Sequence, residues 1–411
     1  MFVHYTNSLS AHQLPLDREL VKRIGADNFR YIYTNEMLQG GAQEVDAKEP
    51  WIIDASKTDV TALLEECDIL LVGGLRPIDL MERRSAAGKI TLYMSERWFK
   101  PVEIGVGVGG GVGVGVGGRC RWRAGIQIPG WVRMSVPRYR RMARRFVRLL
   151  RDDPKCWYLP IGPWAKRDML WLGVPAAKML DWGDFVEPSE VGVDVGVGVG
   201  VGVGVGGGVG GGVGGGVGGG VGGGVGGGGG VGGGVGVGDS PLRLLYVGRL
   251  LRLKHVDTVV RSLEVLRSGG LEVRLTIVGD GPEREWLGRL AKKLGLEDRV
   301  MFRPPVKIEE VREVMRQHDL LVLASDAMEG WGCVVQEALT EGVPVVGTYE
   351  AGASAAILPE TQLFHAGDYR ELARKVVALQ TAGEVVRTLP CDYTPVGGAE
   401  RLLKLVEGLK V

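Results

Sequence analysis

A run of 48 residues, almost all valine or glycine, divides this chain into two parts. The run extends from Val191 to Gly238 and contains 31 glycines, 16 valines and one aspartate. Glycine supplies little apolar surface and costs about 1 kcal/mol per residue in a helix relative to alanine, which argues against a membrane-spanning helix. Phosphate-binding loops need glycines at fixed positions, whereas here every position is interchangeable. We interpret the run as an expanded linker, because closure entropy grows only logarithmically with loop length.

Outside this run the composition is ordinary. A shorter run from Gly105 to Gly118 holds nine glycines and five valines, so the two runs together account for 40 of the 68 glycines. The formal net charge is only +1, and we therefore expect no nucleic-acid partner. The five cysteines are never spaced as Cys-x-x-Cys, which argues for a reducing compartment and against zinc or a disulfide framework. No secretory signal is visible, so we expect a cytoplasmic protein.

Strand and helix patterns alternate on both sides of the long run. Before it, apolar segments predict strands at residues 1–7, 29–35, 51–56, 68–74 and 90–96. After it, strands are predicted at residues 242–248, 273–281, 299–305, 319–325 and 343–349. Such alternation predicts α/β domains, each with a parallel sheet covered by helices on both faces. The chain thus reads as two Rossmann-like domains, whose ligands bind beyond the carboxyl ends of the strands.

Two strand-following loops of the second half carry groups that suit phosphate. In LLYVGRLLRLKHVDTVV a strand ends at Gly248, and Arg249 and Lys254 follow. Arginine can bind two oxygens of a diphosphate, and lysine adds a point charge. The alternative is a turn with a solvated arginine. The loop VGDGPE, which contains Gly279, is likewise either a turn or part of a nucleotide site.

The segment SDAMEGWGCVVQEALTEGVPVVG contains two glutamates eight residues apart. Glu329 precedes a predicted helix and Glu337 lies within it, at most about 12 Å apart along the axis. This is roughly the length of a nucleotide sugar, so one carboxylate can hold sugar hydroxyls and the other ribose hydroxyls, with the phosphates near free helix amides. The alternative is a pair of solvated glutamates that flank a core helix.

These three segments, in this order, closely resemble the donor-binding domain of group 1 glycosyltransferases, which are retaining enzymes with the GT-B fold. The resemblance covers roughly residues 241–405. The segments YTNSLSAHQLPLDREL and YLPIGPWAKRDMLWLGVPAAKMLDWGDFVEP resemble the acceptor domain of the same family. The resemblance implies an acceptor domain at 1–190 with an insert at 105–118, a linker at 191–238 and a donor domain at 239–411, with the two domains facing across a cleft.

The resemblance also implies roles for individual residues. Arg249 and Lys254 bind the donor diphosphate, Glu329 contacts the donor sugar, and Glu337 binds the ribose. The first three of these are the expected catalytic residues. The expected donor-binding set also includes Gly248, Gly279, Gly330, Trp331, Gly332 and Cys333. Relatives usually have a Gly-Gly pair and an acid where this chain has Gly352 followed by Ala-Ser, and this departure affects contacts to the donor sugar.

The acceptor side is less distinctive. Some relatives carry a histidine in a mid-domain loop, but the corresponding segment LYMSERWFKP has none. We take His12, in the first loop, and Ser95 and Glu96, which follow a strand and face the cleft in this interpretation, as acceptor-side candidates. The alternative for His12 is an unremarkable loop histidine.

We therefore expect an enzyme that transfers a sugar from a nucleotide-diphosphate-sugar to a glycan or lipid-linked acceptor with retention of configuration. Metal-dependent glycosyltransferases of the other large fold use Asp-x-Asp, which is absent here. Arg249, Lys254 and helix amides can stabilise the leaving group instead, so we expect neither a metal nor another cofactor. The rival functions are a nucleotide-sugar epimerase and a catalytically silent nucleotide-sugar binding protein. A generic NAD-binding module is disfavoured because no Gly-x-Gly-x-x-Gly follows a strand.

An arginine-rich segment at 138–151 bears on the partners. It lies within PRYRRMARRFVRLLRDD and has Met142, Phe146 and Leu149 at helical spacing. Such a basic amphipathic helix can dock on anionic lipid headgroups, which would place the enzyme on the inner face of the membrane. The alternative is a surface helix of the acceptor domain with solvated arginines.

Overall fold

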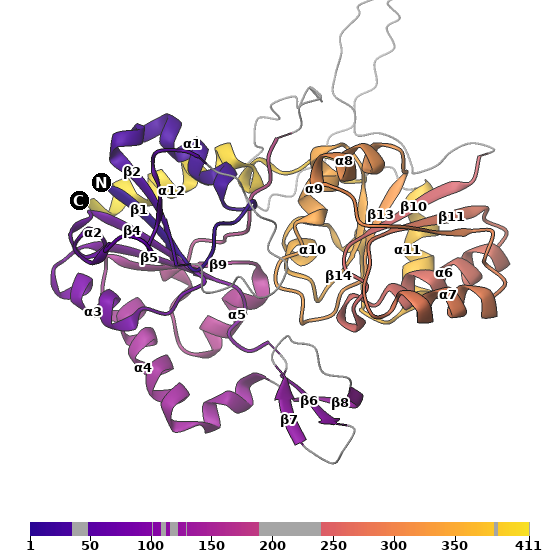
Figure 1. Cartoon of the computed structure of the whole chain (residues 1–411), viewed down its shortest axis with the longest axis horizontal. Coiled ribbons are helices and arrows are strands. Elements are labelled where there is room, and N and C mark those ends of the chain that lie inside the picture. Colours follow the sequence, from indigo (N-terminus) through magenta and orange to yellow (C-terminus); the bar gives the residue numbers. More distant parts are fainter. Residues whose placement is uncertain are drawn as a thin grey trace, which may run out of the picture.

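The computed structural model describes residues 1–34, 48–100, 102–107, 112–115, 122–128, 130–188, 240–381 and 385–410. The long valine–glycine linker lies outside these residues, and the insert at 105–118 is described only in part. The described residues form two α/β domains, each built on a six-stranded parallel sheet (Figure 1). This confirms the fold class that the alternating patterns predict.

The amino-terminal domain has the strand order β3-β2-β1-β4-β5-β9. Every position of the central strand β4 is buried, as expected for a sheet with helices on both faces. The strands are β1 (Phe2–Thr6), β2 (Phe29–Tyr33), β3 (Ile52–Asp54), β4 (Ile69–Gly73), β5 (Ile90–Ser95) and β9 (Cys156–Pro160), and the helices are α1 (Leu14–Ile24), α2 (Thr61–Glu66), α3 (Ile78–Ala86), α4 (Pro137–Asp152) and α5 (Pro163–Trp171).

The carboxyl-terminal domain repeats this topology with the order β12-β11-β10-β13-β14-β15. In both sheets the strand order reverses between the first and fourth strands, at β1/β4 and at β10/β13, and such points are where open α/β sheets bind ligands. The strands are β10 (Leu242–Val247), β11 (Val273–Val278), β12 (Val300–Arg303), β13 (Leu320–Leu323), β14 (Val345–Thr348) and β15 (Leu363–Phe364), and the helices are α6 (Val256–Ser268), α7 (Arg284–Lys293), α8 (Ile308–Arg316), α9 (Val334–Thr340), α10 (Gly352–Ile357) and α11 (Tyr369–Thr381).

A small antiparallel sheet lies between β5 and α4 in the chain and stands apart from the large sheets (Figure 1). Its order is β7-β6-β8, with β6 (Val102–Gly107), β7 (Val112–Gly115) and β8 (Trp122–Ile128). Part of the shorter valine–glycine run therefore pairs as strands. Backbone hydrogen bonding, which is independent of side-chain identity, accounts for such pairing.

The last helix, α12 (Pro395–Lys410), packs on α1 of the amino-terminal domain. Gly398 lies so close to the domain that a Cβ atom there would be 3.2 Å from Leu16 and would overlap the ring of Phe185. The structure therefore moves this helix out of the 239–411 domain that the sequence indicates, and both ends of the chain lie on the same domain (Figure 1). None of the helices in the described part of the chain is long and apolar enough to cross a membrane.

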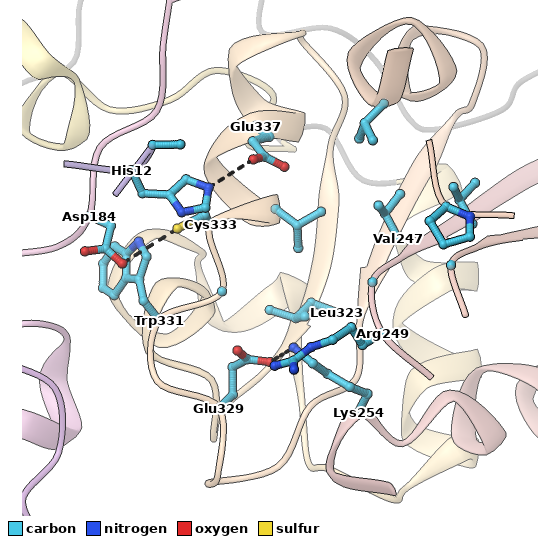
Figure 2. Close-up of a pocket in the computed structure, with 18 of the residues that line it drawn as sticks. His12, Asp184, Val247, Arg249, Lys254, Leu323, Glu329, Trp331, Cys333 and Glu337 are labelled. Atoms are coloured by element: carbon cyan, nitrogen blue, oxygen red, sulfur yellow. Dashed lines mark hydrogen bonds and ion pairs between the residues drawn. The ribbon is translucent and has the colours of Figure 1, made fainter. Parts of the chain in front are cut away.

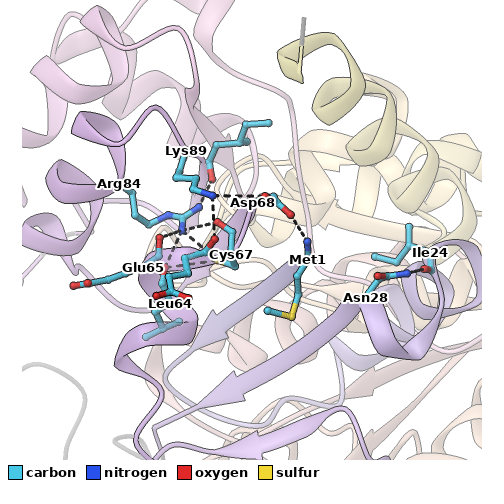
Figure 3. A network of polar contacts seen from close by, with 11 residues as sticks. Met1, Ile24, Asn28, Leu64, Glu65, Cys67, Asp68, Arg84 and Lys89 are labelled. Carbon is cyan, nitrogen blue, oxygen red and sulfur yellow. Dashed lines mark hydrogen bonds and ion pairs between the residues drawn. The ribbon is translucent and has the colours of Figure 1, made fainter.

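A buried arginine closes the carboxyl end of α2 (Figure 3). Arg84 on α3 is only 1% exposed, and its guanidinium donates hydrogen bonds to the carbonyl oxygens of Leu64 at 2.8 Å, Cys67 at 3.0 Å and Ile90 at 2.8 Å. The last carbonyls of a helix lack partners within the helix, so this side chain satisfies groups that burial would leave unpaired. Burial lowers the pKa of Arg84. This residue joins α2, α3 and β5 and is structural.

Candidate functional site

A cavity of about 590 Å³ lies between the two domains, where the loops that leave their strands meet (Figure 2). The amino-terminal domain contributes the loop after β1 and the loop after β5, and the carboxyl-terminal domain contributes the loops after β10, β11 and β13. Most of the site residues expected from the sequence line this interdomain cavity, namely His12, Glu96, Gly248, Arg249, Lys254, Gly279, Glu329, Trp331, Gly332, Cys333 and Glu337.

Two glycines let the loops after β10 and β11 approach each other closely. The backbone N–H of Gly248 donates to the carbonyl oxygen of Val278 at 3.0 Å, and a Cβ atom at Gly279 would overlap the carbonyl oxygen of Gly248. Both glycines have φ values, 149° and 147°, in the region that disfavours side chains. Gly279 thus has a packing role. Arg249 follows in a loop fixed by a 3.0 Å hydrogen bond from the Tyr246 hydroxyl to the Arg249 carbonyl oxygen.

Lys254 and Glu329 form an ion pair inside the cavity (Figure 2). They are 75 residues apart in sequence, and their side chains are 15% and 14% exposed. Burial would raise the pKa of Glu329, but the charge and hydrogen bond of Lys254 outweigh it and hold this pKa below its usual value. The cavity therefore presents an ionised carboxylate paired with a cation, and Arg249 lines the same wall.

His255, the residue after Lys254, adopts a left-handed conformation with a φ of 46°. Its Nε2 atom lies 3.3 Å from Asp326 Oδ2, and the Asp326 N–H donates to the Leu253 carbonyl oxygen at 2.9 Å. The hydrogen bond that His255 donates to the Asp326 carboxylate raises the pKa of His255, although burial opposes this. His255 thereby links the loop that carries Lys254 to the β13–α9 loop, residues 324–333, which carries Glu329.

We expect His255→Ala to be less stable than His255→Gly by about 1 kcal/mol, because alanine keeps the left-handed strain without the bond to Asp326 whereas glycine removes the strain. Urea unfolding measures the difference. The stabilisation that the charged imidazolium adds to this bond is fully present below the unfolded pKa of histidine and is lost as pH rises through the raised folded pKa. The advantage of the wild type over His255→Ala should therefore shrink with rising pH. Equal stability of the two variants would contradict this interpretation.

Glu337 on α9 faces His12 from the other domain. His12 Nε2 lies 3.6 Å from Glu337 Oε1, as Figure 2 shows. Burial disfavours the imidazolium, but the hydrogen bond and charge of Glu337, together with the charge of Asp184, raise the pKa of His12. The two residues were expected to bind different substrates, and the structure brings them together across the cavity.

Asp184 also lines the cavity, although no motif in the sequence marks it as a site residue. It belongs to the segment that ends the amino-terminal domain, and its Oδ2 atom lies 3.7 Å from Cys333 Sγ. Burial and the nearby charge of Glu96 raise the pKa of Asp184 to about 6, although His12 opposes this. Burial beside Asp184 and Glu337 also raises the pKa of the Cys333 thiol well above its usual value. The thiol is therefore a poor nucleophile.

Two of the expected residues do not line the cavity. Ser95 was expected to face it, but its hydroxyl lies 3.1 Å from the Tyr158 hydroxyl, on the neighbouring strand β9. Gly330 instead packs against the acceptor-side candidate Glu96, because a Cβ atom on Gly330 would overlap the Glu96 carboxylate. Glu96 forms an ion pair with Lys100, which the sequence did not indicate.

Residues 235–384 match the family model described as glycosyl transferases group 1. Over 155 residues, which are 37% of this chain and 40% of its relative, the chain is 31% identical to N-acetyl-alpha-D-glucosaminyl L-malate synthase of Bacillus anthracis. Over 128 residues it is 34% identical to GDP-mannose-dependent alpha-(1-6)-phosphatidylinositol monomannoside mannosyltransferase of Mycolicibacterium smegmatis, covering 30% of this chain and 33% of that protein. The chain thus matches less than half the length of these curated relatives.

Solved structures are similar over nearly the whole chain, and two of them illustrate the shared fold. The lipopolysaccharide outer core galactosyltransferase WaaB superimposes with a TM-score of 0.58 at 14% identity, covering 99% of both chains. HepE of Anabaena, in complex with UDP, superimposes with a TM-score of 0.56 at 13% identity, again covering 99% of both. At such identities the similarity concerns the fold, and it confirms the predicted GT-B arrangement.

Proposed function

We propose that this chain, whose residues 235–384 belong to the group 1 glycosyltransferases, transfers a sugar from a nucleotide-diphosphate-sugar to a glycan or lipid-linked acceptor. The observation that carries the proposal is the convergence of Arg249, Lys254, Glu329 and Glu337 on one interdomain cavity. The cations suit a diphosphate and the carboxylates suit sugar and ribose hydroxyls, and the GT-B arrangement leaves an opposite wall for the acceptor.

In this proposal the leaving group is stabilised by the protein alone. A nucleoside diphosphate gains negative charge as the glycosidic bond breaks, and Arg249 and Lys254 lie where that charge develops. Lys254 is bound to Glu329 in the structure, so an incoming diphosphate competes with this carboxylate for the ammonium group. Transfer then needs no metal or cofactor and proceeds with retention, which the family resemblance supports.

The other walls of the interdomain cavity suit the nucleobase of the donor and the acceptor. Val247, Val278, Pro305 and Val306 form an apolar side that can receive the nucleobase. On the facing side Glu96 and Asp184 bring carboxyl groups, with His12 beside them. Carboxyl groups form hydrogen bonds with hydroxyls, so we propose that the reacting end of the acceptor is a hydroxyl-bearing sugar.

Thermal stabilisation by UDP, GDP, ADP and dTDP, followed by product analysis with the matching nucleotide sugar, tests the proposed function. We expect one nucleotide to raise the melting temperature and transfer to continue in EDTA. Conversion of the donor into an epimer without an acceptor would replace the proposal with an epimerase. Binding without turnover would indicate a silent binding protein, and loss of transfer in EDTA would remove the metal-independent mechanism.

We also propose that the surface formed by η2 (Gly130–Ser135) and α4 docks on anionic lipid. The apolar stripe predicted for α4 does not face solvent, because Phe146 is buried and Met142 and Leu149 are partly buried against the domain core. Insertion of this stripe into lipid would therefore require the helix to leave the domain. The exposed groups are instead Trp131, at 57%, and Val136, at 51%, beside exposed arginines at positions 138, 140, 141, 144 and 148.

Replacing Arg140, Arg141 and Arg144 together by glutamine should weaken binding to phosphatidylglycerol vesicles about 100-fold at low salt. The reason is that each cation near an anionic surface contributes about 1 kcal/mol. Vesicle sedimentation measures this. The matched control replaces Arg289, Lys292 and Lys293, three exposed cations of α7, in the same way and should bind like the wild type. Equal weakening in both variants, or no wild-type binding, would contradict docking through α4.

A further inference from the structure

Trp331 is only 2% exposed although it lies in the β13–α9 loop at the margin of the interdomain cavity. Its indole ring occupies a slot walled by three glycines, of which Gly162 and Gly183 belong to the amino-terminal domain and Gly352 to the carboxyl-terminal domain. A Cβ atom would lie 2.5 Å from ring atom Cζ2 if added at Gly183, 3.2 Å from Cε3 at Gly352 and 3.4 Å from Cε3 at Gly162. The side chain that fills this slot thus joins the two domains.

Polar contacts fix the ring in the slot. The indole Nε1–H donates to Gln336 Oε1 at 2.6 Å, and Gln336 Nε2 donates to the carbonyl oxygens of Asp184 at 2.7 Å and Tyr393 at 3.1 Å. Gln336 is fully buried, so water cannot replace these protein partners of its side-chain amide. Asp184 belongs to the amino-terminal domain, and Tyr393 lies two residues before the start of α12, which packs on that domain. A fully satisfied buried network of this kind holds one arrangement rigidly.

In the sequence, Trp331 lies close to Glu329, the carboxylate proposed to contact the donor sugar. Glu329 precedes Trp331 by two residues, and Gly330 between them packs against Glu96 of the amino-terminal domain. Movement of one domain relative to the other therefore acts on the β13–α9 loop directly. The cations Arg249 and Lys254 come from the β10–α6 segment, which does not take part in the slot.

We infer that Trp331 is a positioning residue that couples the relative placement of the two domains to the placement of Glu329. This inference rests on the proposed function. The sequence indicated Trp331 as a donor-binding residue, and its burial between domains assigns it a different task. Nucleotide binding, which depends on Arg249, Lys254 and Glu337, is then largely independent of Trp331, whereas sugar transfer depends on it.

A double-mutant cycle tests the contact itself. Gly183→Ala in the wild type places a methyl group against the ring and should lower the melting temperature by several degrees. In a Trp331→Ala background the slot is empty, so the same change should lower it by less than half as much. The control Gly288→Ala, on α7 with no neighbour near its added Cβ, should raise the melting temperature slightly and by the same amount in both backgrounds, because alanine favours the helix. Additive effects of Gly183→Ala and Trp331→Ala would overturn the assignment.

Kinetics test the positioning role. With the nucleoside diphosphate that stabilises the wild type, Trp331→Ala should bind within about threefold of the wild-type affinity, while kcat for transfer falls at least tenfold. Trp331→Phe refills most of the slot and should recover most of that loss. A Trp331→Ala variant that weakens nucleotide binding at unchanged kcat would make Trp331 a donor-binding residue and overturn the inference. If no donor supports transfer, the proposed function fails separately, and the stability cycle still tests the interdomain contact.

Discussion

Arg249→Ala is expected to lower the rate of sugar transfer by about 10²- to 10³-fold. The guanidinium lines the interdomain cavity together with Lys254, where the proposed function places the departing diphosphate. Removing one preorganised donor from such a position typically costs this much in rate. Nucleoside diphosphate affinity should fall as well, since the diphosphate carries negative charge before the bond breaks. Initial rates at saturating donor and calorimetric affinities measure the two effects.

The control for Arg249 lies in the same loop. Arg252 belongs to the short helix η4 (Arg252–Lys254), is exposed, and does not line the cavity. Arg252→Ala removes the same charge a few residues away and should keep transfer within about threefold of the wild type, because an exposed charge is screened by solvent and salt. If Arg249→Ala were as active as Arg252→Ala, the diphosphate would have to bind elsewhere.

Glu329→Gln is expected to lower transfer by about 10²-fold without weakening the binding of nucleoside diphosphate. The carboxylate is ionised and paired with Lys254, so in its proposed role at the donor sugar the amide would lose a charged contact. The same change frees the Lys254 ammonium group for phosphate, which maintains or increases diphosphate affinity. Lys254→Met should lower both transfer and affinity. Because the two side chains form one pair, the effects of the double variant should not add.

The pair between Arg243 and Asp319 provides the matched control for Glu329. It joins the amino-terminal ends of the parallel strands β10 and β13, with an N–O distance of 2.7 Å, and lies outside the interdomain cavity. Asp319→Asn breaks an ion pair in the same sheet and should leave transfer unchanged after correction for the folded fraction. Weaker diphosphate binding in Glu329→Gln would place Glu329 on the phosphates, contrary to the proposal.

The sequence was sufficient to predict the strands of both sheets and the residues at the centre of the candidate site. Strands β4 and β13 are continuous apolar runs because helices cover both faces of each sheet, and that signal is local. Arg249 and Glu329 follow strands β10 and β13, so the rule that ligands bind beyond strand ends placed them on one edge without any knowledge of distance. Glu337 follows from helical spacing within α9.

The sequence was insufficient wherever a contact joins distant segments. Asp184 had no motif of its own, and it lines the cavity only because the end of the amino-terminal domain packs on α9, through contacts such as the one from Gln336. Ser95 follows a strand as predicted, but its hydroxyl meets Tyr158 of the neighbouring strand. Pairing between strands and between domains is a tertiary property. A shift of one residue along a strand moves a side chain to the other face of the sheet.

The sequence by itself thus determined an α/β chain of two halves and the cations and carboxylates that the second half gathers at its strand ends, because periodicity and strand-end chemistry are local. The tertiary structure decided that α12 returns to the first domain, that His12 meets Glu337, and that Trp331 fills a slot of glycines from both domains. These contacts depend on close packing between segments far apart in the chain. Such packing depends on how side-chain shapes fit together in three dimensions, so no local sequence pattern predicts these contacts.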